Sequence, residues 1–351
     1  MNRKVKTTLI CISTIAAMVL MPACDVEYEP EEIQKPYTYD EAYYENLRSY
    51  KQSEHSIAFV WFADYKKTTS LANRFLGLPD SVDIVSLWGG IPLPDINPLA
   101  YEEMRFVQQV KGMRLVIPTI VRIEDAVSYG DYEFYQLFQE SYDTSIGTAE
   151  ERQEKRNRAI EMYADYLLDM MWDNDLDGLD LDYEPEGDRL SGANMSYFVE
   201  YLGSKIGPMS DHPEKLLIID FYGNYPPAST GPFTSYFVRQ AYTQGFTDHS
   251  ASRLQGYYNS AAAYCPTWKF IVTENIGDHW RTGGSPFTEA DGNTLAADGE
   301  RLYSLEGMAR WNPTQGRKGG FGAFYCQRDY SSSPPYKYLR RGIQAQNPAV
   351  N

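Results

Sequence analysis

The sequence of 351 residues contains few of the side chains from which metal sites are usually built. It has four histidines and four cysteines, and neither a CxxC nor an HExxH motif occurs. The absence of these ligand patterns argues against a zinc enzyme, and we expect no metal or cofactor. Positive charge is also scarce, because 32 Lys and Arg face 48 Asp and Glu, which gives a formal net charge of −16. Such a chain repels phosphate backbones, so we expect no nucleic-acid partner.

The rest of the composition is that of a folded protein. Apolar residues make up 43% of the chain and charged residues 23%, which is too apolar for a disordered chain. Aromatic residues reach 14%, and flat rings stack on sugars as well as fill cores. The length allows one large domain or two ordinary ones. No linker rich in Pro, Gly and Ser interrupts residues 45–345, so a single domain is the simplest division.

The N-terminus has the features of an export signal. Basic side chains within residues 3–6 precede an uncharged apolar run at residues 7–21. This run suits the core of a signal peptide and is short for a membrane span, which needs about 20 residues. Cys24 follows directly after a small residue, as in bacterial lipoprotein signals; plain secretion and an uncleaved anchor are the alternatives. We predict a signal peptide at 1–23, a lipid anchor on Cys24, and an outer-membrane lipoprotein at the cell surface or in the periplasm.

An acidic segment follows Cys24. Residues 25–40 combine many acids with prolines, a composition that cannot bury a core and that indicates a solvated tether. In lipoproteins of the Bacteroides type, an acidic run at this place resembles a surface-export tag, and a simple spacer is the alternative. We place the tether at 24–44 and the folded domain at 45–351.

Beyond the tether, short apolar runs alternate with stretches of helical spacing. We expect strands at residues 57–62, 82–88, 113–121, 178–184, 216–222, 236–242, 269–274 and 320–326. Helical spacing occurs at residues 99–110, 150–172, 197–206 and 302–311. Eight β/α units in a chain of this length predict a single-domain α/β fold, the (β/α)8 TIM barrel. A doubly wound open sheet is the alternative, but no GxGxxG follows the first strand.

Three acids occupy alternate positions of the fourth predicted strand. Because strand side chains alternate between faces, Asp180, Asp182 and Glu184 share one face and lie about 6.6 Å from one to the next. In a barrel this face points inward, with Glu184 nearest the mouth where barrel active sites lie. Left unpaired, buried acids would cost several kcal/mol, which disfavours a purely structural role. A calcium site is possible in principle, but one strand cannot supply all the oxygens it needs. We expect at least one raised pKa and hence a general acid.

The motif DGLDLDYE at residues 177–184 resembles the DxxDxDxE signature of family-18 glycoside hydrolases, the chitinases and endo-β-N-acetylglucosaminidases. The resemblance implies a barrel and a substrate-assisted mechanism, in which the sugar's own acetamido oxygen attacks the anomeric carbon. By this resemblance, Glu184 is the acid and base, and Asp182 orients the acetamido group. Asp180 shares a proton with Asp182, and Tyr242 donates to the acetamido oxygen.

Other segments favour the endoglycosidases within this family. Residues 240–242, which include Tyr242, resemble the sixth-strand motif of the family. Gln240 resembles the endoglycosidase variant of this motif more than the Met usual in chitinases, and Thr243 stands where chitinases commonly have Asp. The third predicted strand lacks the SxGG of chitinases, and the eighth lacks their Trp. With the lipoprotein signal, the pattern is similar to endo-β-N-acetylglucosaminidase-like proteins of gut Bacteroides that cut the chitobiose core of N-glycans. A chitinase, or a non-catalytic glycan-binding lipoprotein on the same barrel, remains the alternative.

The expected ligand is therefore a glycan that contains N-acetylglucosamine. Besides Gln240, the candidate sugar-binding residues end other strands; they are Trp88, Asp220, Tyr222, Asn275 and Tyr325. We expect a monomer located near glycan-import proteins. Strand order places Cys265 at the bottom of the barrel and Cys326 at its mouth, roughly 20 Å apart, which predicts two free thiols rather than a disulfide.

Overall fold

The computed structural model describes residues 35–66, 70–243 and 249–348, so the predicted signal peptide and Cys24 lie outside the described residues. Eight parallel strands close into a barrel in the order of the chain, with β8 paired to β1. The predicted (β/α)8 barrel is confirmed. The strands are β1 (Ile57–Phe62), β2 (Ile84–Leu87), β3 (Arg114–Ile120), β4 (Gly178–Tyr183), β5 (Leu216–Phe221), β6 (Tyr236–Gln240), β7 (Phe270–Asn275) and β8 (Gly320–Phe324).

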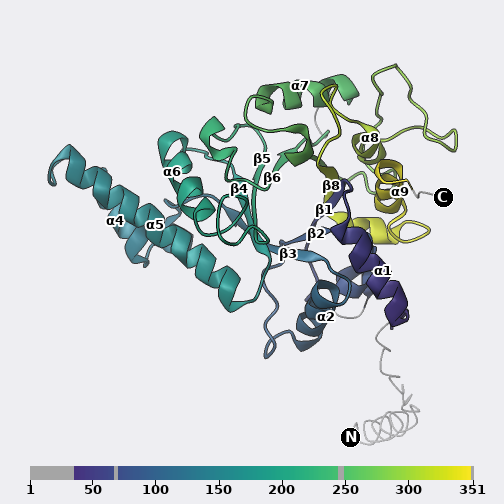
Figure 1. The fold of residues 1–351 in the computed structure, drawn as a ribbon, viewed down its shortest axis with the longest axis horizontal. Helices are drawn as coiled ribbons and strands as arrows, with labels where there is room; N and C mark the ends of the chain where they lie inside the picture. The colour runs from purple at the N-terminus through teal and green to yellow at the C-terminus, as the bar shows by residue number, and fades with distance from the viewer. Residues whose placement is uncertain (1–34, 67–69, 244–248, 349–351) are drawn as a thin grey trace, which may run out of the picture. The chain divides into compact units, whose positions relative to one another are not determined.

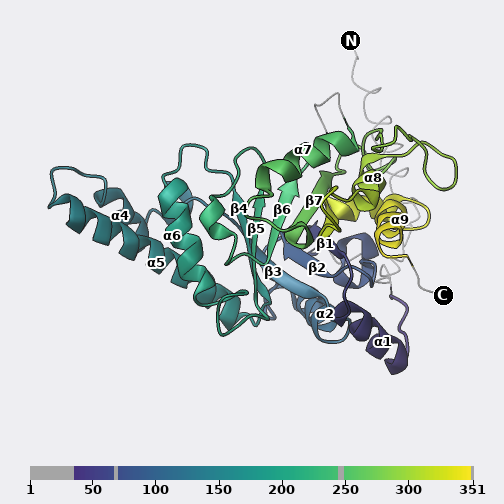
Figure 2. The ribbon, with the colours of Figure 1, turned by 45° about the horizontal axis from the view of Figure 1, so that its top comes forward.

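Helices surround the ring of strands (Figures 1 and 2). The α-helices are α1 (Glu41–Gln52), α2 (Pro98–Gln109), α3 (Ala126–Tyr129), α4 (Glu133–Glu140), α5 (Ala149–Asp173), α6 (Gly192–Gly203), α7 (Ala251–Ala261), α8 (Ser304–Arg310) and α9 (Lys337–Gln346). Short 3-10 helices are η1 (Leu71–Asn73), η2 (Phe75–Gly77), η3 (Ala228–Thr230), η4 (Thr267–Lys269) and η5 (Cys326–Ser331). None of the helices in the described ranges is long and apolar enough to cross a membrane.

Helix α1 begins inside the segment that the sequence predicts as a tether. The Asp40 side chain accepts a hydrogen bond from the backbone N–H of Tyr43 at 2.9 Å and so caps the helix before residue 45. Tyr44 is buried, and Arg48 donates to the carbonyl of Val110 at 2.8 Å. The folded domain therefore starts earlier than predicted, because an acidic N-cap and a buried Tyr offset the acidic composition around them.

Two apolar layers hold the barrel together. The strand residues that point outward pack under the helices, and on β4 these are Leu179, Leu181 and Tyr183. A smaller cluster fills the barrel interior; it contains Phe59, Trp61, Ile84, Val116, Leu216, Ile218, Val238 and Ile271. The interior is thus packed with side chains, as in other TIM barrels, and open space for a ligand is left only towards the ends.

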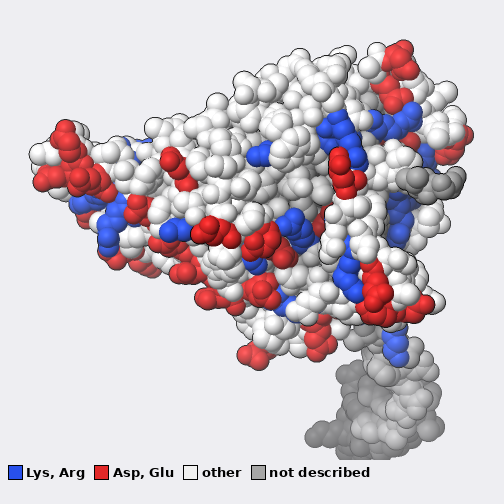
Figure 3. All heavy atoms as spheres, in the orientation of Figure 1, with Lys and Arg blue, Asp and Glu red and all other residues white. Residues whose placement is uncertain are grey.

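The connection between β3 and β4 is a long helical excursion. Helix α5 starts with a capping box, in which Thr148 and Glu151 each accept a bond from the other's backbone N–H. Acidic side chains are spread over the surface near this helix and over the lower part of the same face (Figure 3), as the net charge of −16 requires.

Candidate active site

A cavity of about 250 Å³ opens where the strands end, at the C-terminal face of the barrel. Active sites of TIM barrels lie on this face. The cavity brings together six residues that the sequence singles out and three that it does not. The first six are Trp88, Asp182, Glu184, Asp220, Gln240 and Tyr242, and the others are Trp61, Ile120 and Phe324.

The acids of β4 form the predicted inward column. Asp180 and Asp182 are buried in the barrel, while Glu184, just past the last strand residue, is only half-buried at the opening. Glu184 is therefore the acid of this strand that a ligand in the cavity reaches most directly. Side chains alternate along β4, so the three acids point into the barrel while the residues between them pack in the outer apolar layer.

Arg122 braces the end of the column, a role that the sequence does not reveal. Its guanidinium donates to the backbone carbonyl of Glu184 at 3.2 and 3.3 Å and to Glu186 Oε2 at 3.2 Å. The bond to a main-chain atom fixes where the Glu184 side chain starts and leaves its carboxyl group free to face the cavity.

Asp180 is anchored at the bottom of the column by two residues from other strands. Trp61 Nε1 and Ser86 Oγ donate to Asp180 Oδ2 at 2.9 and 2.7 Å. Neither donor is among the site residues predicted from the sequence. Alternation on β1 and β2 is the signal that could have revealed them, because it points Trp61 and Ser86 inward.

Asp220 and Gln240 link the column to β5 and β6. The side-chain amide of Gln240 donates through Nε2 to Asp220 Oδ1 at 2.5 Å and to Asp182 Oδ1 at 3.2 Å. Asp220 also lies within hydrogen-bonding reach of both Asp180 and Asp182. Asp180 Oδ1 and Asp220 Oδ2 are buried atoms for which the described residues provide no hydrogen-bond donor. A proton on either carboxyl group would satisfy both atoms. Asp220 therefore joins Asp180 and Asp182 as a third carboxyl group of the cluster, which the sequence did not place beside them.

Burial raises the pKa values of the whole cluster. Burial lifts the pKa of Asp180 to about 6, and burial together with the charges of Glu184 and Asp180 lifts that of Asp182 to about 7. Burial and the charges of Asp180 and Asp182 raise the pKa of Asp220 well above its ordinary value. The pKa of Glu184 is raised as well, first by burial and then by Glu186. These groups can therefore hold protons near neutral pH, as the sequence predicts.

Aromatic rings form the other wall of the cavity. The Phe324 ring stacks on Tyr242 with centroids 6.3 Å apart and meets Trp88 and Trp61 edge-on at 5.5 and 6.1 Å. Burial raises the pKa of Tyr242 far above its usual range, so its hydroxyl stays protonated and can donate. Phe324 thus occupies the wall at the end of β8, where the sequence lacks the Trp of chitinases.

Tyr325, the predicted residue of this strand, does not line the cavity. Its backbone turns to φ +57°, which ends β8 before the predicted residue 326 and starts η5. The Tyr325 ring instead contacts the Arg328 guanidinium, 5.3 Å from the ring centroid. The physical reason is that Phe324 is the last residue of β8 and packs on the interior cluster, whereas Tyr325 has already left the strand.

Two other predicted residues lie outside the cavity wall. Tyr222 is 40% exposed beside it, with its ring centroid 6.3 Å from that of Tyr242. Asn275 Oδ1 accepts a bond from the Gly277 backbone N–H at 2.9 Å, which shapes the turn after β7. Tyr222 remains placed to touch a larger ligand, whereas the contact of Asn275 is structural.

Neither metal ligands nor a disulfide is found in the described residues. Within residues 35–66, 70–243 and 249–348, no group of three or more His, Cys, Asp or Glu could hold a metal ion. Cys265 precedes β7 and Cys326 follows β8, and both are buried free thiols.

A closed (β/α)8 barrel with a column of raised-pKa carboxyl groups at its mouth, faced by aromatic rings, is the architecture of a glycosidase. Residues 22–345 match the family model described as Glycoside hydrolase family 18, BT1044-like, and the chain belongs to this family.

Several known proteins resemble the chain over most of its length. Endo-β-N-acetylglucosaminidase F2 of Elizabethkingia meningoseptica is 24% identical over 299 residues, which cover 81% of this chain and 77% of that enzyme. The solved structure of a BT1044 variant has a TM-score of 0.70 at 24% identity and covers 88% of this chain and 93% of its own. That of an endo-β-N-acetylglucosaminidase from Cordyceps militaris has a TM-score of 0.58 at 22% identity, covering 91% and 99%. These structures share the fold.

Proposed function

We propose that the protein is an endo-β-N-acetylglucosaminidase that cleaves the chitobiose core of N-glycans. The observation that carries the proposal is the single cavity in which Glu184, Asp182, Gln240 and Tyr242 meet. The names of the relatives support it: one is an endo-β-N-acetylglucosaminidase, and a variant of the Cordyceps militaris enzyme was solved with fucosyl-N-acetylglucosamine-Asn.

The catalytic step is substrate-assisted. The 2-acetamido oxygen of the sugar attacks the anomeric carbon while Glu184 protonates the leaving oxygen, which gives an oxazolinium ion. Glu184 then takes a proton from a water molecule. The water oxygen attacks the anomeric carbon, which opens the oxazolinium ring and restores the acetamido group. Because the sugar supplies the nucleophile, the half-buried Glu184 at the opening serves as both acid and base.

The remaining polar residues hold the acetamido group. Asp182 accepts a hydrogen bond from its N–H and stabilises the positive ring, which requires the ionised form of Asp182. The buried partners Asp180 and Asp220 keep a proton close by and thereby allow Asp182 to ionise when the sugar is bound. Tyr242 donates a hydrogen bond from its phenolic O–H to the acetamido oxygen, and the Phe324 ring stacks on the Tyr242 ring. No metal or cofactor takes part.

The cellular setting is part of the same proposal. The mature chain is anchored to the outer membrane through lipid on Cys24, acts as a monomer and works near glycan-import proteins. Its substrate is a glycan that contains N-acetylglucosamine, presented at the cell surface or in the periplasm.

The test is incubation of the purified protein with a high-mannose and with a complex N-glycoprotein, followed by mass spectrometry of the released glycans. We expect released glycans that carry one N-acetylglucosamine at the reducing end, and none from Glu184→Gln. Release from neither glycoprotein, with cleavage of chitin oligomers instead, would favour a chitinase. Glycan binding without any cleavage would favour a binding lipoprotein.

A further inference from the structure

A second cavity, which we call the basal cavity, lies at the opposite, N-terminal end of the barrel. It has a volume of about 430 Å³, within the range of roughly 300–1,000 Å³ that is typical of small-molecule sites. Strand starts and the residues around them form its wall, among them Ile57, Ile84, Arg114 and Tyr236. The basal cavity is therefore separated from the Glu184 cavity by the packed interior of the barrel.

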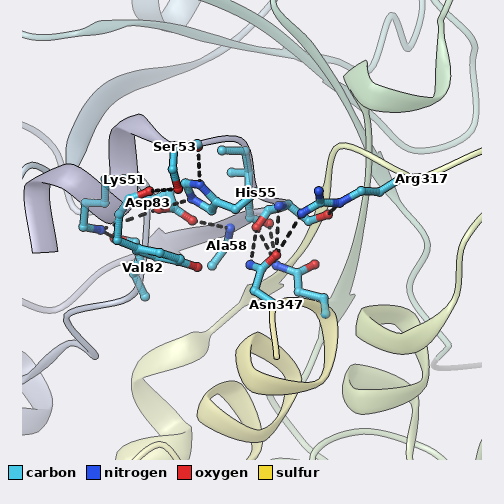
Figure 4. A network of polar contacts seen from close by, with 12 residues as sticks. Lys51, Ser53, His55, Ala58, Val82, Asp83, Arg317 and Asn347 are labelled. Carbon is cyan, nitrogen blue, oxygen red and sulfur yellow. Dashed lines mark hydrogen bonds and ion pairs between the residues drawn. The ribbon is translucent and has the colours of Figure 1, made fainter. Parts of the chain in front are cut away.

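One side of the basal cavity carries an acid whose negative charge is already balanced by neighbouring basic side chains. Asp83 Oδ1 lies 3.0 Å from His55 Nε2 and 3.7 Å from Lys51 Nζ, and Asp83 Oδ2 accepts the backbone N–H of Ala58 at 2.8 Å. Figure 4 shows Lys51 and His55 converging on this carboxylate. The other acid of the wall, Glu54, is exposed at the end of α1.

The other side carries an arginine that is held in place without being neutralised. Arg317 Nε donates to Ser56 Oγ at 2.9 Å, and Nη2 donates to Asn347 Oδ1 at 3.1 Å, as Figure 4 shows. Asn347 is itself fixed, because its side chain accepts from the Ser56 N–H at 3.0 Å and donates to the Ser56 carbonyl at 2.7 Å. Two neutral partners therefore orient the guanidinium and leave further N–H groups for a ligand.

Arg114 adds a second uncompensated cation. Its guanidinium donates to the backbone carbonyl of Glu214, and this carbonyl does not balance the positive charge of Arg114. Among the described residues, no carboxylate lies within ion-pair distance of Arg114 or Arg317. In a chain with a net charge of −16, two arginines that share one cavity without an acid partner form a local site for an anion.

An aromatic side chain lies on the same cavity wall. Trp268 from η4 is 60% exposed, although a residue of this size and apolarity usually gains from burial. An exposed indole offers a flat apolar face on which a sugar ring can stack, whereas an inorganic anion has no use for it. The combination of two arginines and an exposed indole in one cavity favours a ligand with both a carboxylate and a ring.

We propose that the basal cavity binds an acidic saccharide unit, with its carboxylate on Arg114 and Arg317 and its ring against Trp268. The site is an anchoring site for carboxylated glycan and takes no part in bond cleavage, because it lies at the other end of the barrel from Glu184. This inference goes beyond the proposed function and does not depend on it.

The test is calorimetric titration of the purified mature chain with methyl β-glucuronide, with methyl β-glucoside as the matched neutral ligand and sodium sulfate as the plain anion. We expect the glucuronide to bind at least about tenfold more tightly than the glucoside. Arg317→Gln should weaken glucuronide binding about tenfold or more, and Trp268→Ala should weaken binding of the glucuronide but not of sulfate.

Matched controls are Arg301→Gln and Trp172→Ala, which change an exposed arginine and an exposed tryptophan outside the basal cavity. Both should bind glucuronide like the unchanged chain, and thermal unfolding of all four variants should confirm that they fold. Equal binding of glucoside and glucuronide, or no binding of the glucuronide, would overturn the proposal. Glucuronide binding that Trp268→Ala leaves intact would show an anion site with no sugar preference. Hydrolysis of a neutral high-mannose substrate should be unchanged in Arg317→Gln, so failure of this proposal and of the proposed function can be told apart.

Discussion

Asp220 is expected to carry a proton in the folded protein, and Asp220→Asn tests this directly. The amide of Asn has the shape of a protonated carboxyl group: its oxygen can accept from Gln240 Nε2, and its nitrogen can donate to Asp180 Oδ1. If Asp220 is protonated, the replacement preserves every contact. Asp220→Ala, the control, removes both contacts and should cost about 1–3 kcal/mol, because it leaves buried polar groups unpaired.

The difference in stability between the Asp220→Asn variant and the unchanged chain depends on pH in a predictable direction. The pKa of Asp220 is raised well above its ordinary value by burial, so above about pH 4 the folded chain holds a proton that the unfolded chain has lost. Stability therefore falls as pH rises, by about 1.4 kcal/mol per pH unit for this one group. Asp220→Asn removes this dependence. As the pH rises from 4.5 to 6, the variant should therefore gain stability relative to the unchanged chain, for as long as folded Asp220 keeps its proton.

Urea unfolding at pH 4.5, 5.25 and 6, extrapolated to zero denaturant, measures this difference. A stability difference between the two chains that stays constant over these pH values would show that Asp220 is ionised when folded, and would refute the shared proton. Hydrolysis provides a second readout. Asp220→Asn should retain activity within about tenfold at pH 6, whereas Asp220→Ala should lose more, because Gln240 then no longer holds Asp182 in place.

Three further predictions concern the catalytic column and the thiols. Glu184→Gln should lower hydrolysis about 10²–10⁴-fold or more while glycan binding in a pull-down persists, because Gln cannot give up a proton; unchanged turnover would remove Glu184 from its role. Asp182→Asn should lose most hydrolysis but still transfer sugar from a preformed oxazoline donor, and an equal loss of both reactions would assign Asp182 another task. Thiol counting on denatured, unreduced mature protein should find Cys265 and Cys326 free, and finding neither would contradict the strand order.

The alternation of side chains along the strands made much of the fold predictable, and six of the nine residues that line the cavity were singled out from the sequence. Alternation on β4 placed Asp180 and Asp182 inside the barrel and left the intervening residues to the outer layer. The directions of side chains at strand ends were less predictable, because the backbone leaves the strand conformation there and alternation no longer applies. The eighth strand shows this: Phe324 lines the cavity, and Tyr325 leaves the strand at φ +57°.

Contacts between distant strands could not be predicted from one sequence. Trp61 and Ser86 donate to Asp180 across 119 and 94 residues of chain, and nothing local distinguishes them from other inward residues. Arg122 acts through a backbone carbonyl, which leaves no side-chain pattern in the sequence. The start of the folded domain was predicted too late for a different reason, since the acidic composition hid the local helix cap at Asp40.

The column on β4 draws its partners from both halves of the barrel. The donors to Asp180 come from β1 and β2, whereas the neighbours of Asp182, namely Asp220 and Gln240, come from β5 and β6. The two donors to Asp180 Oδ2 therefore belong to the N-terminal half, whereas Asp220, which neighbours both Asp180 and Asp182, belongs to the C-terminal half. In a chimera that exchanges the second half of the barrel with that of a relative, Asp220 and Gln240 would change together, while Trp61 and Ser86 would still donate to Asp180.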